Sequence, residues 1–364
     1  MKKKKAGLFR RILRALGIVC LCAVLLLAGM VGFLSVTEYR PTDRETLKIN
    51  GSVSAHPQIG QPLTVVSWNI GYGALGDNAD FFMDGGSMVR TADKSRIEQN
   101  LDDITSQIRA MQPDVLLLQE IDRDSARSEH IDAFARLSKD LSGYCASFAN
   151  NFKVVFLPYP VPPIGKVDSG VATFSAFRTT DATRIQLPIP FSWPIRAANL
   201  KRCLLVSRIP VEKSDKELVI VNLHLEAYDD GVGRIAQTKM LAELLSAEAA
   251  KGNYVIAGGD FNQLFSNIEN PWPVYPDKWL PGVVDAEAFP GMLTLLMDPA
   301  VPTCRSLDRP LAGADPAQFQ FYVIDGFIVS NNVEVESLQT LDLGFVCSDH
   351  NPVQLRVKLL PSED

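Results

Sequence analysis

Short apolar runs alternate with amphipathic segments from residue 63 almost to the end of the chain. Runs bounded by turn residues predict buried strands. They cover residues 63–70, 115–120, 218–225, 254–257, 321–329 and 352–359. No internal repeat and no second domain boundary interrupts this pattern, so residues 62–360 are expected to form one α/β domain.

Three segments between these strands carry apolar residues at helical spacing. They predict helices from Thr91 or Asp93 to Ile108, over 130–141, and from Ile235 to a C-cap at Gly252. Proline-rich stretches predict connecting segments rather than regular elements. We expect ordered loops with aromatic residues over 157–163 and 188–194, and a long loop region with one short helix over 264–316.

The N-terminal segment has a different pattern. Residues 15–37 carry no charge and are long enough to span a bilayer, whereas residues 1–14 hold seven basic residues and no acidic one. The positive-inside rule then predicts a cytoplasmic tail over 1–14, a transmembrane anchor over 15–37, and a polar stalk over 38–61 that carries the domain outside the cell. A cleaved signal peptide is the alternative, but the apolar run is long and lacks a clear Ala-x-Ala site.

Charge and cysteine content narrow the possible functions. The 364 residues have a net charge of −6, and the +7 of residues 1–37 leaves −13 for the rest. An acidic body argues against strong non-specific binding of nucleic acid, although a local basic cleft stays possible. Of six cysteines, two lie in the apolar run. Cys145, Cys203, Cys304 and Cys347 form no CxxC pair, which disfavours a zinc site, and we expect buried thiols, with two disulfides as the alternative.

Polar residues stand in or directly after the apolar runs. In a packed sheet such residues meet at one rim, where active sites are commonly built. Taken singly, each has an ordinary structural explanation, such as a turn, a cap or a core histidine. Together they supply carboxylates and amides for a hard cation and a histidine–carboxylate pair for activating water. They are Asn69, Glu120, His224, Asp260, Asp325 and His350.

These residues lie in six short motifs whose order resembles the endonuclease/exonuclease/phosphatase superfamily of metal-dependent phosphoester hydrolases. The resemblance covers roughly residues 63–360. It implies a four-layer α/β sandwich, in which two packed mixed β-sheets are flanked by helices. The motifs are Ser67-Trp68-Asn69-Ile70, Leu118-Gln119-Glu120, Asn222-Leu223-His224-Leu225, Gly259-Asp260-Phe261-Asn262, Ile324-Asp325 and Ser348-Asp349-His350.

The resemblance also implies a metal site. Glu120 would be the principal Mg²⁺ ligand, and Asn69 would lie beside it, as a ligand directly or through water. Asp349 would assist metal binding. Mg²⁺ suits such a sparse set of oxygen ligands because it keeps several waters, and Mn²⁺ would be a substitute.

The catalytic roles follow by matching each position to its motif. His350 would be the general base that activates water, and Asp325 would orient it. Asp260 would position the nucleophile or a metal-bound water. Asn262 and His224 would donate hydrogen bonds to phosphoryl oxygens.

The substrate is less defined by the sequence. Asn262-Gln263-Leu264 and Ile324-Asp325-Gly326 lack the pattern of inositol polyphosphate 5-phosphatases. The anchor and the aromatic loops favour a lipid headgroup or another phosphodiester outside the cell, although these aromatics could equally be packed under loops. A nuclease acting on extracellular DNA or RNA and a catalytically inactive binding module are the alternatives. Candidate phosphate contacts are Arg178, Arg184, Arg202 and Arg208.

Overall fold

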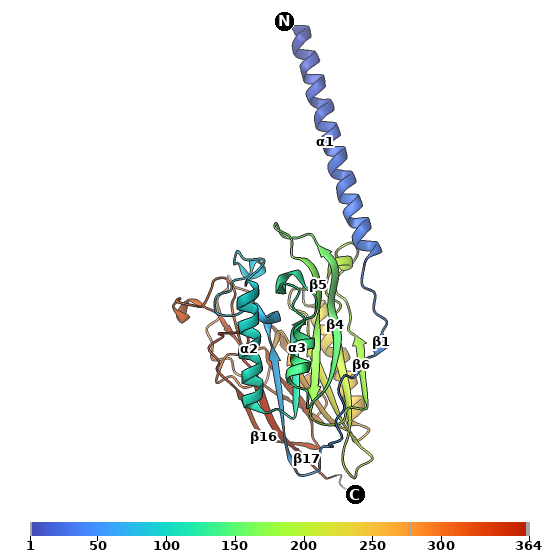
Figure 1. The fold of residues 1–364 in the computed structure, drawn as a ribbon, viewed down its shortest axis with the longest axis vertical. Coiled ribbons are helices and arrows are strands. Elements are labelled where there is room, and N and C mark those ends of the chain that lie inside the picture. Colours follow the sequence, from blue (N-terminus) through green and yellow to red (C-terminus); the bar gives the residue numbers. More distant parts are fainter. Residues whose placement is uncertain (1, 277, 362–364) are drawn as a thin grey trace.

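The computed structural model describes residues 2–276 and 278–361. Its first element, α1 (Lys2–Val36), projects away from a single α/β domain (Figure 1). Residues Phe9–Val36 of this helix are long and apolar enough to cross a membrane, and none of them is buried in the domain, although four near the C-terminal end of the helix are half-buried. The remaining chain folds into the domain, with its C-terminal end opposite α1 (Figure 1).

One sheet has seven strands. β8 and β9 run parallel, and the other neighbours are antiparallel. In spatial order the strands are β1 (Arg44–Thr46), β6 (Asp181–Gln186), β7 (Cys203–Pro210), β8 (Glu217–His224), β9 (Tyr254–Asp260), β15 (Asp325–Ser330) and β12 (Leu293–Leu296).

The other large sheet has six strands, of which β2 and β3 run parallel. Its order is β16 (Val333–Thr340), β17 (Val353–Leu359), β2 (Pro62–Asn69), β3 (Val115–Asp122), β5 (Gly165–Ser175) and β4 (Cys145–Leu157). Two small pairs are β10 (Gln263–Phe265) with β11 (Gly282–Val284), and β13 (Cys304–Arg305) with β14 (Phe321–Tyr322). The short 3₁₀ turns are η1 (Gly71–Gly73), η2 (Phe82–Asp84), η3 (Ala126–Ser128), η4 (Ile195–Ala198), η5 (Ala286–Ala288) and η6 (Pro316–Gln318).

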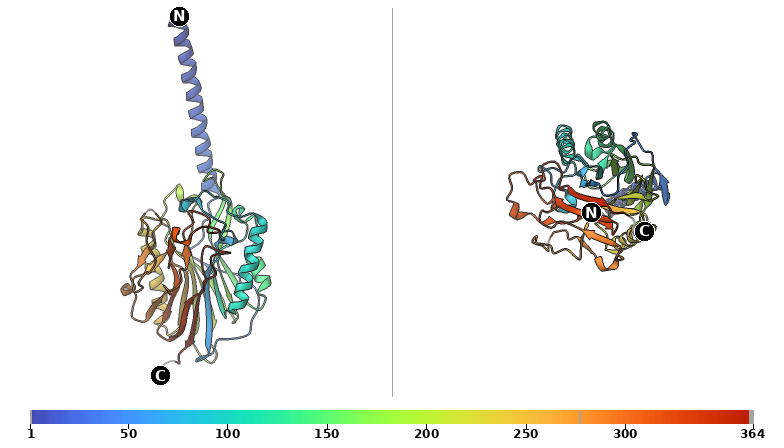
Figure 2. Two further views of the ribbon diagram at one scale, coloured as in Figure 1. Left: turned by 90° about the vertical axis from the view of Figure 1, so that its left-hand side faces the viewer. Right: turned by 90° about the horizontal axis from the view of Figure 1, so that it is seen from below.

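The two large sheets pack face to face because strand side chains alternate between faces. Leu117 of β3 and Phe327 of β15 lie in the apolar layer between the sheets. The opposite face of the six-stranded sheet is covered by α2 (Lys94–Met111) and α3 (Ala133–Asp140), and that of the seven-stranded sheet by α4 (Val232–Ala249). The helices therefore lie outside two packed sheets (Figure 2), which confirms the expected four-layer sandwich.

The strong sequence patterns correspond to observed elements. The six predicted strands appear as β2, β3, β8, β9, β14 with β15, and β17, and the three helices as α2, α3 and α4. Asp93 rather than Thr91 caps α2, because its carboxylate accepts a hydrogen bond from the Arg96 amide at 2.8 Å. The expectation for 264–316 was incomplete, since this region contains β11, β12 and β13, and β12 joins the seven-stranded sheet.

The segment 38–61, expected as a stalk, lies against the domain instead. Residues 44–46 form β1, which pairs with β6 at the sheet edge. Leu47 donates a backbone hydrogen bond to Ala182, and Asn50 forms a bridge to Ala146 of β4. Leu47 and Ile49 also cover a small apolar cluster between the sheets. The segment therefore joins both sheets and fixes the chain that leaves α1.

The cysteines of the domain are free thiols rather than disulfides. Cys145, Cys203, Cys304 and Cys347 are all buried, as the apolar reading of the sequence expects. Burial raises the pKa of Cys304 and of Cys347 to about 12 in each case, so both are protonated at neutral pH.

Replacing Leu117 tests the packing between the sheets. Leu117→Ala should lower the free energy of unfolding by about 2–5 kcal/mol, because it leaves a cavity at a fully buried position. Leu280→Ala removes the same atoms at an exposed loop position and should change the free energy of unfolding by no more than about 0.5 kcal/mol. Denaturant unfolding of the detergent-solubilised chain, followed by tryptophan fluorescence, measures both. Equal effects would contradict the assignment of Leu117 to the core.

Candidate active site

The predicted polar residues gather where the two sheets meet at one end. Asn69 ends β2, His224 and Asp260 end β8 and β9, and Asp325 begins β15. The register places Asp260 opposite both His224 and Asp325. Residues 349 and 350 lie just before β17, which pairs with β2. We call the end of the domain that holds these residues the site end.

A local irregularity directs Glu120 into this group. The pairing of β3 with β5 shifts between Leu118 and Ile121, which is a β-bulge. Glu120 takes a φ of 51° there and is half-buried, while its neighbours in β3 are buried. A bulge re-aims a side chain that a regular strand would direct to one fixed face. The strained backbone at Glu120 is therefore tied to the position of its carboxylate.

His350 and Asp325 form a buried pair. The His350 Nδ1 lies 2.8 Å from the Asp325 Oδ2, and the two side chains are 5% and 1% exposed. Burial disfavours a charge on the ring, but the negative partners outweigh burial, and the pKa of His350 lies well above its usual value. Since Cys304 is protonated at neutral pH, Asp325 supplies that negative charge. When Nδ1–H donates to Asp325, the ring is oriented with Nε2 toward the other site residues.

Asn69 connects the two halves of the site. Its Nδ2 donates to the Asp260 Oδ2 at 3.0 Å and lies 3.4 Å from the Glu120 Oε1 and 3.5 Å from the His350 Nε2. Its Oδ1 accepts a hydrogen bond from the Gly71 amide at 3.1 Å. Only the oxygen of an amide can ligate a cation. In this arrangement Asn69 therefore positions its neighbours, and its N–H rather than its oxygen faces Glu120.

Asp260 and His224 form the third part of the cluster. The His224 Nε2 lies 3.3 Å from the Asp260 Oδ2, which is 3.8 Å from the His350 Nε2. Burial, reinforced by Asp325, raises the pKa of Asp260. Burial, reinforced by the charge of Arg202, lowers the pKa of His224 well below its usual value, so this ring is neutral. A neutral imidazole has one N–H, and the His224 Nδ1 has no partner among the described residues.

Asn262 lies at the edge of the same cluster. Its backbone amide donates to the Asp260 Oδ1 at 2.8 Å, which fixes that carboxylate. Its side-chain Nδ2 donates to the Leu225 carbonyl at 3.0 Å, and its φ is 52°. One amide hydrogen of the side chain is thus used by the backbone, and a second is available.

Glu120 and Asp349 form the acidic side of the site. Burial raises the pKa of Asp349 to about 6 against the influence of His350, and the charge of Glu120 adds to this increase. Two neighbouring carboxylates suit a hard divalent cation, because the cation would neutralise their negative charge. The donor set thus fits Mg²⁺ or Mn²⁺ at Glu120 and Asp349. Among the described residues, two groups of three potential ligands lie close together, Asp260–Asp325–His350 and Cys304–Asp349–His350, and neither includes Glu120.

Several contributing residues were not singled out from the sequence. The Gln119 Nε2 donates to the Asn222 Oδ1 at 2.9 Å, and Asn222 donates in turn to the Leu118 and Ala172 carbonyls. These fully buried amides join the two sheets beneath the site. Each lies in a motif that also contains a candidate site residue. This position was the only feature of the sequence that could have indicated their role.

The four candidate arginines have different roles. Arg202 is 5% exposed, lies 3.9 Å from Glu226 and is close enough to act on His224, so it alone of the four adjoins the site. Arg184 is fully buried and donates to backbone carbonyls, and Arg208 pairs with Glu217 and Glu248. Arg178 follows β5 at the opposite end of the sheet. The expectation of phosphate contacts is therefore wrong for Arg184, Arg208 and Arg178.

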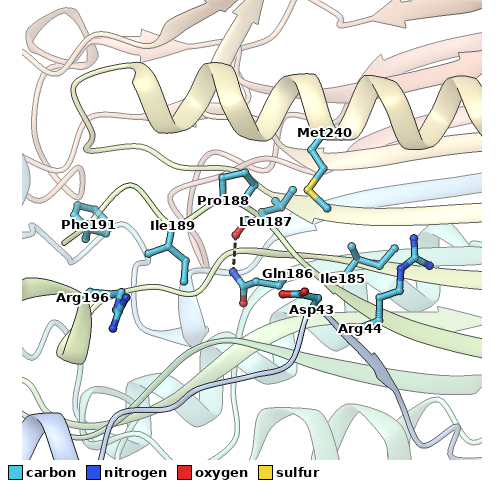
Figure 3. A pocket seen from close by; sticks show the side chains of 10 residues that line it. All are labelled: Asp43, Arg44, Ile185, Gln186, Leu187, Pro188, Ile189, Phe191, Arg196 and Met240. Atoms are coloured by element: carbon cyan, nitrogen blue, oxygen red, sulfur yellow. Dashed lines mark hydrogen bonds between the residues drawn. The ribbon is translucent and has the colours of Figure 1, made fainter. Parts of the chain in front are cut away.

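A cavity of about 460 Å³ lies apart from this cluster. It is bounded by the end of β6, the following loop, Met240 of α4, and Asp43 and Arg44 at the start of β1 (Figure 3). Its lining is largely apolar, with Gln186 donating to the Leu187 carbonyl (Figure 3). The chemistry-bearing groups therefore concentrate at the strand ends and not in this cavity.

Comparison with known proteins agrees with this arrangement. The model of the Endonuclease/Exonuclease/phosphatase family matches residues 66–350. An endonuclease/exonuclease/phosphatase from Beutenbergia cavernae DSM 12333 is 20% identical, with a TM-score of 0.56 over 82% of this chain and 72% of that one. The human Nocturnin catalytic domain with bound sulfate is 19% identical, with a TM-score of 0.52 over 86% and 97%.

A third similar structure is D. rerio TDP2 complexed with a single-strand DNA product. It is 15% identical, with a TM-score of 0.50 over 82% of this chain and 99% of that one. At these identities the three structures show a shared fold. No curated protein matches the chain in sequence.

Replacing Glu120 tests the acidic side of the site. Glu120→Gln should weaken Mg²⁺ binding by about tenfold or more, because it removes one unit of charge a few ångströms from the cation. Glu98→Gln, an exposed position on α2, is the matched control and should bind as the wild type does. Isothermal titration calorimetry measures both affinities. Unchanged binding by Glu120→Gln would remove Glu120 from the metal site.

Proposed function

The chain belongs to the endonuclease/exonuclease/phosphatase family of metal-dependent phosphoester hydrolases, and from this premise we propose a membrane-anchored, outward-facing enzyme that hydrolyses phosphodiesters with Mg²⁺. Water attacks the phosphorus in line, the P–O bond on the opposite side breaks, and the leaving alkoxide departs and takes up a proton, without a covalent enzyme intermediate. The observation that carries this proposal is the buried His350–Asp325 pair at 2.8 Å, in contact with the acidic strand-end cluster.

His350 is the general base in this proposal. Asp325 holds the ring through Nδ1, and in the neutral ring Nε2 is free to take a proton from the attacking water. A cation bound at Glu120 and Asp349 would oppose a positive charge on this ring and so favour its neutral form. Nε2 lies 3.5 Å from the Asn69 amide nitrogen and 3.8 Å from the Asp260 carboxylate. Asp260 accepts hydrogen bonds from Asn69 and from the Asn262 amide, so its position is fixed, and it can orient the nucleophile.

The remaining site residues bind the metal ion or the negatively charged phosphoryl group. Glu120 and Asp349 would hold Mg²⁺, with Mn²⁺ as a substitute, and the bound cation would neutralise negative charge on the phosphoryl group. Asn69 holds the Glu120 and Asp260 carboxylates in place. The free amide hydrogen of Asn262 and the His224 ring can donate to phosphoryl oxygens as charge develops there, and Arg202 adds a nearby positive charge.

Two alternatives use the same observations differently. A surface nuclease would share this chemistry. D. rerio TDP2, which has a similar fold, is complexed with a single-strand DNA product. The acidic body of this chain disfavours a nuclease, because phosphate backbones are held by Lys and Arg. An inactive binding module would be expected to lack part of the site, whereas all eight candidate residues are present, seven of them buried and Glu120 half-buried.

Replacing His350 tests the catalytic assignment. His350→Gln should lower turnover of bis(p-nitrophenyl) phosphate with Mg²⁺ by about 10²–10⁴-fold, because it removes the base. His130→Gln is a matched control, since His130 Nδ1 lies 2.6 Å from Asp124 in an exposed histidine–aspartate pair. That variant should keep wild-type turnover. Wild-type turnover by His350→Gln would exclude His350 as the base.

Protease digestion of intact cells tests the orientation of the chain across the membrane. The basic residues of 1–14 should remain on the cytoplasmic side, with the domain outside. Protease added to intact cells should then digest an epitope at the C-terminal end and spare one at the N-terminal end. Protection of the C-terminal epitope, with digestion only after lysis, would contradict the proposed orientation.

A further inference from the structure

The C-terminal end of α1 is held against the domain by side-chain contacts. The Trp193 Nε1 donates to the Ser35 Oγ at 2.9 Å. Just after the helix, the Glu38 side chain is 2% exposed and pairs with Arg196 at 3.1 Å and Lys201 at 3.3 Å. The helix is therefore docked on the loop between β6 and β7, and the domain has a defined orientation toward it.

This docking loop leaves the seven-stranded sheet at the site end. Gln186, the last residue of β6, pairs with Cys203 at the start of β7, and the next residue, Leu204, pairs with Leu223. Leu223 directly precedes His224. The loop over residues 187–202 and the catalytic cluster therefore share one end of the sheet.

The hairpin between β4 and β5 projects from the same end. Gly170 of β5 pairs with Ile121, which follows Glu120, so the earlier residues of β5 extend past the site. Figure 1 shows this hairpin at the end of the domain from which α1 projects. We call residues 158–164 of the hairpin and 187–202 the apical loops.

The apical loops present large apolar side chains to the surroundings. Tyr159 and Val161 of the hairpin are 67% and 93% exposed, and Trp193 and Ile195 of the docking loop are 60% and 63% exposed. Residues 154–165 and 187–195 contain no charged residue. Packing beneath loops therefore does not account for these four side chains, and aqueous exposure of such tips is unfavourable.

The position of α1 indicates that the bilayer covers the exposed side chains of the apical loops. Residues 15–37 carry no charged residue, and Glu38 is the first that follows, so α1 leaves the hydrocarbon layer close to Ser35. Trp193 is hydrogen-bonded to Ser35 and must lie at that depth. Tryptophan and tyrosine are enriched at this boundary between hydrocarbon and water. A protein partner would have to occupy a surface that the bilayer already adjoins.

We propose that the apical loops lie in the headgroup layer of the bilayer spanned by α1, so that the site end faces the membrane and the enzyme hydrolyses phospholipid headgroups of that same membrane. This inference rests on the proposed function and specifies its substrate class. The short connection between α1 and the domain then places the catalytic cluster next to its substrate.

A binding experiment tests the membrane contact without relying on activity. The full-length chain is reconstituted into vesicles of phosphatidylcholine and phosphatidylglycerol with brominated acyl chains, and tryptophan fluorescence is recorded. The wild type should show a quenched component that Trp193→Phe removes and Trp272→Phe retains. Equal quenching of wild type and Trp193→Phe would overturn the membrane position of the docking loop.

An activity experiment tests the substrate class. The double variant Val161→Ser, Ile195→Ser should release headgroups from the same vesicles about tenfold more slowly, because two apolar contacts with the membrane are lost. Its turnover of soluble bis(p-nitrophenyl) phosphate should be unchanged. Val335→Ser, at an exposed position on β16 far from the site end, is the control and should leave both rates unchanged.

The possible failures are distinguishable. Wild-type turnover of the soluble diester without headgroup release would overturn the lipid substrate and leave the hydrolase proposal standing, and nicking of plasmid DNA would then identify a nuclease. Equal headgroup release by the double variant and the wild type would overturn the role of the apical loops. Inactivity on every probe with Mg²⁺ and Mn²⁺ would overturn the proposed function and with it the substrate assignment, while quenching would still report on the membrane contact.

Discussion

The face-to-face packing of two sheets is the constraint on which the rest of the molecule depends. Hydrogen bonds cross between the sheets at the site end, from Asn69 to Asp260 at 3.0 Å and from His350 to Asp325 at 2.8 Å. Each of these buried groups has its partner on the opposite sheet. An unpaired buried polar group costs about 1–3 kcal/mol, so correct packing and a complete site favour each other.

The hydrogen bonds of Asn69 also keep the groups suited to metal binding apart from the group suited to proton transfer, although they lie within a few ångströms of each other. Asn69 lies between the carboxylate of Glu120 on one side and the His350 ring on the other. The acidic side suits a hard cation, while the ring held by Asp325 suits proton transfer. A single amide thus sets the spacing between the proposed metal ligand and the proposed base. The bulge at Glu120 contributes to this spacing because it turns the carboxylate out of the regular strand pattern.

The connection between α1 and the domain is fixed by the same kind of packing. The segment 38–61 pairs with the edge of one sheet and bridges to the other, so it holds the domain and does not act as a free tether. Glu38 and Trp193 fix the helix to a loop of the site end. The elements that position the candidate catalytic residues therefore also set their direction relative to α1. A flexible stalk would leave that direction undefined.

The sequence by itself determined the elements whose signals are local. Long apolar runs specified β2, β3, β8 and β9, helical spacing specified the three helices of the domain, and the motifs placed the candidate site residues at strand ends. Polar or mixed strands such as β4, β6 and β16 were not anticipated, because solvent covers part of their surface and weakens the apolar pattern.

Only the tertiary structure decided which groups meet. Arg184 and Arg202 look alike in sequence, yet one is bonded to backbone carbonyls and the other adjoins His224. The amide direction of Asn69, the bulge at Glu120 and the docking of Trp193 on Ser35 likewise depend on neighbours far away in the chain. Spacing along a strand fixes the face of a side chain, but the partner on that face comes from the packing of the other sheet.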